Sequence, residues 1–354
     1  MTQGESTGRR ARAHAGPGGR RPTINDVARI AGVSKKTVSR VINESPLVRG
    51  ETREAVKKVI QETGFSPDPH ARSLAFRRAF LVGLIYDNPN PQHTVSHQEG
   101  LLEAFKTSGL ELAIRPIDRS SPRRLAEIRT FVERQKPFGV VLPSPVSEDE
   151  ALVELLKSLN CPYVRIAAVP LDSPDRMVVS HDGDGAAEAA RHLADLGHRR
   201  IALILGPTTF RSSLERRRGF EAGLAERGLT LDPALIKSAG YTYETGLEAA
   251  RELFALADRP TAVFALNDEM ATGVYRAARE AGLQVPQDVS VVGFDDAPIA
   301  TRIWPTLSSV RLPLRDMGRM AGEMLAPNGI LDPEAAHEVW PQLVVRESSA
   351  PPPA

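Results

Sequence analysis

The hydrophobic pattern near the N-terminus predicts two short helices that meet at a glycine. The first helix has apolar residues at the i, i+3, i+4 and i+7 positions of one face, namely Ile24, Val27, Ala28 and Ala31. Thr23 precedes this face and Asp26 follows three residues later, which is the pattern of a capping box. Gly32 can supply the bend, and Ser34 can cap a second helix that runs to about Asn43.

The second helix divides into an apolar face and a hydrogen-bonding face. Its inward positions are Val33, Thr37, Val38, Val41 and Ile42. Its outward positions carry side chains that form hydrogen bonds, namely Lys35, Lys36, Ser39, Arg40 and Asn43. A short helix, a glycine turn and a basic second helix are typical of a helix-turn-helix that contacts DNA. The alternative is that these cations only solvate an exposed helix face.

A third helix completes this N-terminal unit. It is expected from about Glu51 to Thr63, with Gly64 ending it. Its inner stripe closes a three-helix head and consists of Val56, Val59 and Ile60. Prolines then interrupt the pattern at 65–69, and residues 70–75 could form a short helix.

From Phe80 onward, strands alternate with helices. The expected strands are Leu81–Tyr86, Leu112–Arg115, Val140–Pro143, Tyr163–Ala167, Val178–Ser180, Ile201–Leu205, Ile236–Ala239, Ala262–Ala265, Val289–Phe294 and a late strand Val339–Val345. The expected helices are Glu99–Ser108, Pro122–Gln135, Glu148–Leu159, Gly183–Gly197, Ser213–Arg227, Tyr243–Leu256 and Asp268–Ala281. This alternation predicts two sets of parallel βαβ units with helices on both sheet faces. The segment after Leu307 is expected to cross back to the first set.

The net charge of +1 hides an uneven distribution. Residues 1–78 hold 16 Lys and Arg against 7 Asp and Glu, whereas the remainder holds 29 against 37. A basic head on an acidic body is expected of a phosphate-binding unit attached to a separate domain. Residues 1–22 have almost no large apolar side chain, so we expect a disordered basic tail.

Composition also bears on the compartment. The single cysteine, Cys161, excludes an internal disulfide and suits a reducing cytoplasm. The longest apolar runs, such as Ile201–Leu205, have the length of a strand and are far too short to span a membrane. The basic N-terminus lacks the apolar segment of a secretory signal. We therefore expect a cytoplasmic protein with no membrane partner.

The helix-turn-helix segment matches a family signature. The pattern D-V-A-x-x-A-G-V-S-x-x-T-V-S-R-V-x-N is matched in full from Asp26 to Asn43. In this the chain resembles the lactose/galactose repressor (LacI/GalR) family of transcriptional regulators. Three later segments are also similar to the family: Arg216-x-x-Gly219-Phe220, Ala265–Ala271 and Val291–Asp296. Arg49 departs from the family, which usually has a small hydroxyl residue there to cap the third helix.

The resemblance implies an α/β architecture with a DNA-binding head. It consists of an N-terminal three-helix helix-turn-helix head plus a hinge helix, followed by a two-lobed periplasmic-binding-protein-like core of parallel sheets. The expected bounds are 23–66 for the head, 67–78 for the hinge, 79–346 for the effector-binding and dimerisation core, and 347–354 for a flexible tail. A homodimer would bind double-stranded operator DNA, and a ligand between the lobes would change its affinity by altering the order of the hinge helices.

The resemblance also assigns roles in DNA binding. Lys35, Lys36 and Ser39 would reach base edges, and Arg40 could recognise guanine through two hydrogen bonds. Phosphate contacts are expected from Thr23, Ser34, Thr37, Asn43 and Thr52. In the hinge, Leu74 would wedge between base steps of the minor groove, with Ala71 beside it. The alternative is a linker helix whose Leu74 packs on the core.

Effector residues are expected in the loops after the strands, because open parallel sheets bind ligands at the carboxyl ends of their strands. The candidates in the first lobe are Asp87, Asn88, Ser144 and Arg165. Those in the second lobe are Ser212, Arg216, Tyr241, Asn267 and Asp295. The resemblance separately supports Arg216, Asn267 and Asp295. Such side chains suit sugar hydroxyls, and Tyr241 could stack on a pyranose. Asp268 and Asp296 are expected to be structural.

Neither catalysis nor a cofactor has support in the sequence. A Gly-x-x-x-x-Gly-Lys-Ser/Thr loop, a Gly-x-Gly-x-x-Gly turn after the first strand and a Gly-x-Ser-x-Gly elbow are all absent, so we expect no cofactor and no enzyme. His181, His192 and His198 do not have the spacing of a zinc site. Three alternatives stay open: a sugar-transport component, an enzyme using Asp87 and Asp295 as an acid–base pair, and a purine effector stacked on Tyr241.

Overall fold

The computed structural model describes residues 22–42, 47–65, 80–88, 90–326 and 335–353. The chain forms two compact units, Met1–Arg77 and Arg78–Ala354, which are treated separately below. The basic tail, the expected hinge helix 67–78 and three expected DNA contacts, Asn43, Ala71 and Leu74, lie outside the described residues.

The first unit is the expected three-helix head. Its helices are α1 (Ile24–Ile30), α2 (Lys35–Ile42) and α3 (Gly50–Thr63). They pack around a small valine-rich core that includes Val27, Val38, Val41, Val56 and Val59. The predicted capping box is present, because the Thr23 hydroxyl accepts from the Asp26 amide while the Asp26 carboxylate accepts from the Thr23 amide. Arg49 gives α3 no side-chain cap, and Gly64 ends it with φ 65°.

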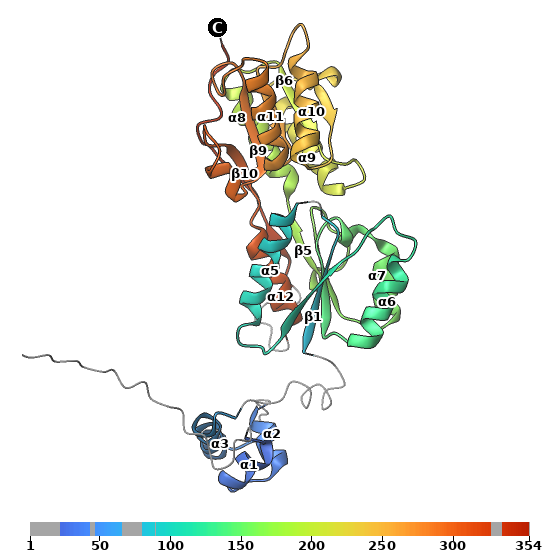
Figure 1. Ribbon diagram of the computed structural model, residues 1–354, viewed down its shortest axis with the longest axis vertical. Coiled ribbons are helices and arrows are strands. Elements are labelled where there is room, and N and C mark those ends of the chain that lie inside the picture. Colours follow the sequence, from blue (N-terminus) through green and yellow to red (C-terminus); the bar gives the residue numbers. More distant parts are fainter. Residues whose placement is uncertain (1–21, 43–46, 66–79, 89, 327–334, 354) are drawn as a thin grey trace, which may run out of the picture. The chain divides into compact units, whose positions relative to one another are not determined.

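The second unit contains two lobes, each built on a six-stranded sheet. The first sheet has the order β11-β5-β4-β3-β1-β2 and is parallel throughout. Its strands are β1 (Leu81–Tyr86), β2 (Glu111–Pro116), β3 (Gly139–Leu142), β4 (Tyr163–Ala167), β5 (Met177–Ser180) and β11 (His337–Val339). One face carries α5 (Pro91–Phe105) and α12 (Leu314–Leu325), and the other carries α6 (Arg124–Gln135) and α7 (Glu150–Ser158) (Figure 1).

The sheet of the second lobe repeats this arrangement, with the order β12-β10-β9-β8-β6-β7. Its strands are β6 (Ile201–Leu205), β7 (Ile236–Ser238), β8 (Ala262–Ala265), β9 (Ser290–Asp295), β10 (Ser308–Arg311) and β12 (Gln342–Val344), of which only β12 is antiparallel to its neighbour. Its helices pack in two pairs: α8 (Asp182–Asp195) against α9 (Arg211–Ala225), and α10 (Tyr243–Phe254) against α11 (Asp268–Glu280).

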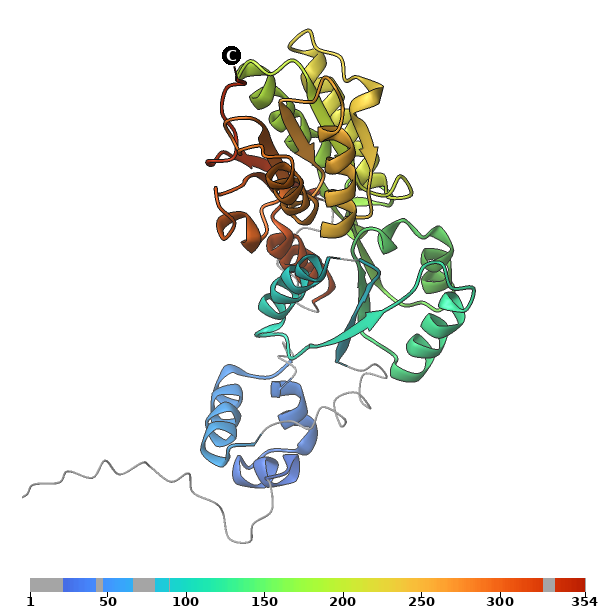
Figure 2. The ribbon, with the colours of Figure 1, turned by 45° about the horizontal axis from the view of Figure 1, so that its top comes forward.

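The chain passes between the lobes three times. It crosses from β5 to α8, from β10 to α12 and from β11 to β12. The expected return to the first lobe is confirmed, since α12 packs against α5 and the two helices lie side by side in both views (Figures 1 and 2). Because these crossings tie the two sheets together, the lobes form a single folding unit with a cleft between them.

Three expectations about elements were wrong. Helix α5 begins at Pro91 rather than Glu99, because the Asn90 side chain caps it by accepting from the Gln92 amide. The single late strand is two short strands in different sheets, since the chain crosses between lobes at Trp340 and Pro341. The segment after 346 is not wholly a free tail: Ser348 is fully buried and Ala350 hydrogen bonds with Ser290.

The two helices that carry the site described below, α8 and α9, approach at glycines. A Cβ on Gly219 would lie 1.9 Å from the Gly183 carbonyl oxygen, which belongs to the backbone of α8. Such an overlap cannot be relieved by rotating a side chain. The glycine in the Arg216-x-x-Gly219-Phe220 segment is therefore a packing requirement.

We expect Gly219→Ala to lower the free energy of unfolding of the core by about 2 kcal/mol or more, because it forces α8 and α9 apart. Urea titration of the full chain would measure the change. Gly240→Ala is the matched control, since its Cβ would lie 3.5 Å from Thr245 Cγ2, an ordinary contact. Equal stabilities of the two variants would contradict the prediction.

Candidate functional site

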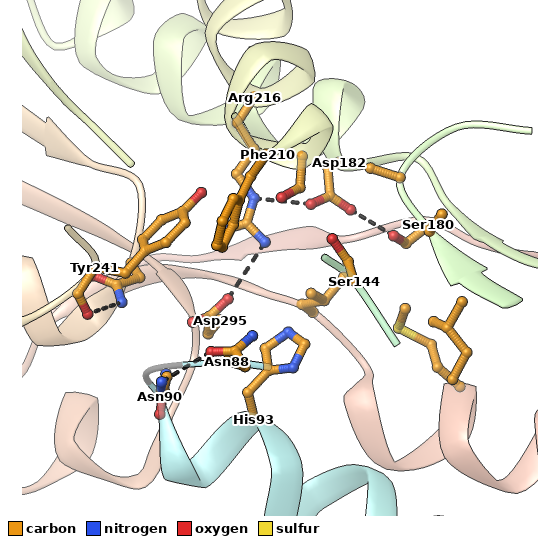
Figure 3. A pocket seen from close by; sticks show the side chains of 17 residues that line it. Asn88, Asn90, His93, Ser144, Ser180, Asp182, Phe210, Arg216, Tyr241 and Asp295 are labelled. Atoms are coloured by element: carbon orange, nitrogen blue, oxygen red, sulfur yellow. Dashed lines mark hydrogen bonds and ion pairs between the residues drawn. The ribbon is translucent and has the colours of Figure 1, made fainter. Parts of the chain in front are cut away.

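A pocket lies where the carboxyl ends of the strands of both lobes meet. Each sheet reverses its order next to its first strand, between β1 and β3 in one lobe and between β6 and β8 in the other. Such switch points are where open α/β sheets bind ligands. The pocket is lined by Asn88, Asn90, His93, Ser144, Ile166, Ala167, Ala168, Ser180, Asp182, Phe210, Ser212, Arg216, Tyr241, Asn267, Asp295, Leu312 and Met317 (Figure 3).

Arg216 is the electrostatic centre of the pocket. It lies on the second turn of α9, and its Nε donates to Asp182 Oδ2 at 2.8 Å while Nη1 donates to the Leu266 carbonyl oxygen at 2.6 Å. Its Nη2 lies 3.6 Å from Asp295 Oδ1 (Figure 3). The guanidinium carbon is 3.7 Å from the centroid of the Phe294 ring. The protein thus takes two of the five N–H donors of this guanidinium in hydrogen bonds and balances its charge with two carboxylates.

Asp295 supplies the opposite charge from the end of β9. Burial raises its pKa to about 7, although Arg216 opposes the shift; Asp182 and Glu269 add to it. Within the described residues, Asp295 Oδ1 is buried without a hydrogen bond and has only the longer ion pair with Arg216. An acceptor held in this way can receive a hydroxyl donor from a ligand.

Asn267 and Tyr241 are held by each other. Asn267 caps α11 by accepting from the Met270 amide at 2.9 Å, and its Nδ2 donates to the Tyr241 carbonyl at 3.0 Å. The Tyr241 ring lies against Gly206, where a Cβ would come within 2.1 Å of the ring. Because one ring face is covered, Tyr241 contributes an apolar wall together with Phe210, whose centroid is 5.8 Å away.

The first lobe contributes neutral polar groups. Asn88 accepts from the Asn90 amide at 2.9 Å, and Asn90 caps α5. His93 lies on the first turn of that helix. Burial, with contributions from His97 and Arg216, lowers the pKa of His93 well below 6.5, so the ring is neutral at pH 7.

Two of the expected effector residues do not line the pocket. Arg165 points away from it and is fully buried, with Nε donating to the Ser147 carbonyl and Nη2 to Glu150. Side chains alternate along a strand, so Arg165 belongs to the opposite face of β4 from the pocket residue Ile166. Asp87 accepts from the Arg119 amide at the base of a loop. These two predictions are wrong, and the acid–base pair of Asp87 and Asp295 loses its basis.

The other expected effector residues all line the pocket: Asn88, Ser144, Ser212, Arg216, Tyr241, Asn267 and Asp295. As expected, Asp268 and Asp296 have structural partners, since Asp268 accepts from Ser309 and the Ala297 amide, and Asp296 pairs with Arg311 and Arg346. Sequence reasoning missed His93, Ser180, Asp182 and Met317. The sequence signal for Asp182 is its position just after the end of a strand. This signal does not give its location, because the chain crosses to the other lobe after β5.

The head presents its basic helix to solvent. Lys35, Lys36 and Arg40 of α2 are exposed, whereas Ser39 and Thr37 are half-buried. Ser34 begins the helix and accepts from the Thr37 amide at 3.1 Å. Thr23 and Thr52, on the N-terminal sides of α1 and α3, are also half-buried. A basic face of this kind, on the second helix of a helix-turn-helix, can enter the major groove.

The head and the core each match a known family. Residues 23–68 match the model of the bacterial regulatory proteins of the lacI family, and residues 190–349 match the periplasmic binding protein-like domain. The HTH-type transcriptional regulator CelR of Thermobifida fusca is 36% identical over 318 residues, which cover 86% of this chain and 91% of CelR. The chain belongs to the LacI family.

Other relatives and solved structures agree. Catabolite control protein A of Priestia megaterium is 31% identical, covering 86% of this chain and 91% of the relative. A CelR–cellobiose complex superimposes with a TM-score of 0.69 at 32% identity, covering 93% of this chain and all of that chain. The Lac repressor dimer bound to operator and the anti-inducer ONPF has a TM-score of 0.74 at 26% identity, covering 94% of this chain and all of that chain.

Membership in the family confirms the predicted function class. This LacI-family protein is a DNA-binding transcriptional regulator under ligand control, and the family consists of regulators rather than enzymes. In the described part of the chain no helix is both long and apolar enough to cross a membrane. The same residues contain no cluster of three or more His, Cys, Asp or Glu arranged to hold a metal ion.

The raised pKa of Asp295 predicts a pH-dependent stability. Between the unfolded value of about 4 and the folded value of about 7, the folded core holds a proton that the unfolded chain has lost. The free energy of unfolding should therefore fall as pH rises through this window, by up to about 1.4 kcal/mol per pH unit. Above the folded pKa both states are ionised and the dependence ends.

Asp295→Asn removes this pH dependence of the free energy of unfolding because the amide does not titrate. The melting temperature of wild type minus that of the variant should fall from pH 5 to about 7 and then level off, as measured by differential scanning calorimetry without ligand. A difference that stays constant from pH 5 to 8 would show that Asp295 ionises at its ordinary pKa.

Proposed function

We propose that this regulator is a cytoplasmic homodimeric repressor whose operator affinity is controlled by an uncharged saccharide bound between the lobes. The charge balance of the pocket is the observation that carries the proposal. Arg216 is the one permanent cation among the pocket-lining residues that the structure describes, and it is already paired with Asp182. A carboxylate or phosphate on the effector would find no unpaired cation, whereas sugar hydroxyls can use neutral donors and acceptors.

In this proposal each wall of the pocket has its own role. Asp295 accepts from a sugar hydroxyl, and the remaining Arg216 N–H groups donate to another. Further polar contacts come from Asn88, Ser144, Ser212 and Asn267, together with His93. The rings of Phe210 and Tyr241 cover an apolar face of the sugar. The solved complex of the relative CelR with cellobiose supports a saccharide.

The head would bind one half of a near-palindromic operator. Base edges are assigned to Lys35, Lys36, Ser39 and Arg40, and phosphates to Thr23, Ser34, Thr37, Asn43 and Thr52. Ala71 and Leu74 of the hinge are assigned to the minor groove. The Lac repressor was solved as a dimer on its operator, which supports a dimer here. Effector binding would shift the order of the two hinge helices and so change DNA affinity.

Selection from a library of palindromic duplexes, followed by titration with ligands, tests the proposal. We expect one operator to be selected and its affinity to change at least tenfold with a neutral mono- or disaccharide. The matching uronate and sugar phosphate should have no effect, and neither should guanine or hypoxanthine. A response confined to an acid, a phosphate or a purine would overturn the assignment of an uncharged saccharide. Failure to select any duplex at low salt would contradict the operator assignment itself.

Two substitutions in the head separate base recognition from phosphate contact. Lys36→Ala should cost about 1–3 kcal/mol on the selected operator and relax selection at one base pair, because a base contact is lost. Thr52→Val should weaken binding to all duplexes equally, because phosphates carry no sequence information. Fluorescence anisotropy on the operator and a scrambled duplex measures both. Equal losses on the two duplexes for Lys36→Ala would place Lys36 on the phosphates.

A further inference from the structure

The start of helix α9 is held by a carboxylate from the other lobe. Glu148 lies at the end of a 3-10 turn, Val146–Glu148, that follows β3 of the first lobe. Its Oε2 accepts from the backbone amide of Arg211, the first residue of α9 in the second lobe, at 3.1 Å. Its Oε1 accepts from the Ser144 hydroxyl at 3.1 Å, which fixes the direction of the carboxylate.

Among the residues that the structure describes, no side chain of its own lobe caps helix α9. Its N-cap residue is Phe210, whose side chain accepts no hydrogen bond, and its first turn contains no acidic residue. A helix start without a cap leaves amides unpaired at the positive end of the helix dipole. A carboxylate is the group that best satisfies both needs, and here it comes from across the cleft.

A second contact joins the same two loops. The guanidinium of Arg119, in the loop after β2, lies 5.5 Å from the centroid of the Phe210 ring. The Arg119 amide is anchored to Asp87 in the first lobe at 3.1 Å. Two loops of the first lobe therefore meet consecutive residues, Phe210 and Arg211, at one point of the second lobe.

Helix α9 also brings two of the second lobe's polar groups to the pocket. Ser212 and Arg216 lie one and five residues after Arg211, and both line the pocket. Glu148 itself does not line the pocket. Burial raises the pKa of Glu148, while the Arg211 amide, Ser144 and the nearby charges of Arg119 and Arg211 oppose the shift and favour the carboxylate. Breaking the contact would return this carboxylate to water but leave α9 without its cap.

We propose that Glu148 is a positioning residue for effector binding, because it caps α9 across the cleft. This contact favours the arrangement in which the loop that carries Glu148 meets the start of α9, which we call the closed arrangement of the lobes. The effector then binds to a pocket whose Arg216 and Ser212 are already in place. The inference rests on the proposed function only in that α9 carries effector residues. It names neither the sugar nor the operator.

Hydrogen exchange on the full chain without any ligand tests the cap. In Glu148→Ala we expect the segment 207–214 to exchange about fivefold faster than in wild type, which corresponds to the loss of one helix cap. Glu148→Gln keeps an acceptor oxygen but not the charge, so its exchange should be intermediate. Glu154→Gln is the matched control, because Glu154 lies nearby on α7, is exposed and, within the described part of the chain, forms an ion pair with Lys157 alone. Unchanged exchange in Glu148→Ala would overturn the cap.

A distance measurement separates closure of the lobes from local fraying of α9. Spin labels at Arg134→Cys on α6 and Ala225→Cys on α9 are both at exposed positions, and the native Cys161 is buried. By pulsed electron–electron resonance we expect the closed-distance population of the ligand-free protein to fall about fivefold relative to the open one in Glu148→Ala. The Glu154→Gln control should match wild type. A faster-exchanging segment with an unchanged distance distribution would make Glu148 a local cap only and overturn its role in closure.

These measurements can refute the role of Glu148 without refuting the proposed function, and the reverse also holds. If no saccharide alters operator binding but Glu148→Ala still opens the core, the effector assignment fails and the cap stands. If a saccharide acts but Glu148→Ala changes neither exchange nor distance, the cap fails and the effector assignment stands. A melting curve for each variant confirms that the measured molecules are folded, and Glu148→Gln provides the milder change if Glu148→Ala does not fold.

Discussion

The buried ion pair of Arg216 and Asp182 is the constraint on which the effector pocket depends. A guanidinium removed from water is tolerated only when its hydrogen bonds and its charge are matched. Here the match comes from Asp182 at 2.8 Å and the Leu266 carbonyl at 2.6 Å, with Asp295 at 3.6 Å. Arg216 and Asp182 lie on α9 and α8, and these helices come close enough only because Gly219 meets Gly183. The ion pair that balances the charge of Arg216 therefore depends on the close packing of α8 against α9.

This arrangement places a sensing group beside a crossing between the lobes. Asp182 begins α8 directly after the crossing from β5, and it is oriented by Ser180 at the end of that strand. A ligand that contacts Arg216 or Asp295 acts on groups tied to this crossing. Because a ligand shifts an equilibrium only through contacts that differ between two states, a site spanning both lobes is suited to changing their angle. The cap from Glu148 to α9 adds a contact between the lobes, because Glu148 follows β3 in the first lobe and Arg211 begins α9 in the second.

The local elements were predictable wherever one short-range rule decided them. The capping box of Thr23 and Asp26 and the end of α3 at Gly64 follow from side chains within a few residues. Buried parallel strands such as Ile201–Leu205 follow from apolar runs of strand length. Helix α5 begins before the expected Glu99 because Asn90 caps it and Pro91 occupies its first turn. Arg165 was misplaced because a strand-end position alone does not say which face a side chain occupies.

The sequence by itself determined the family and the helix-turn-helix, and seven of the nine effector residues it named line the pocket, because motif spacing and strand ends are local properties of the chain. Tertiary structure alone decided which of those side chains remain available to a ligand. The Arg165 guanidinium donates hydrogen bonds to the Ser147 carbonyl and to Glu150, whereas Asp295 Oδ1 is left without a hydrogen bond in the described residues. It also decided that Glu148 caps a helix 63 residues away in the chain. Hydrogen-bond partners and desolvation depend on groups brought together by folding, and no pattern along the chain records that proximity.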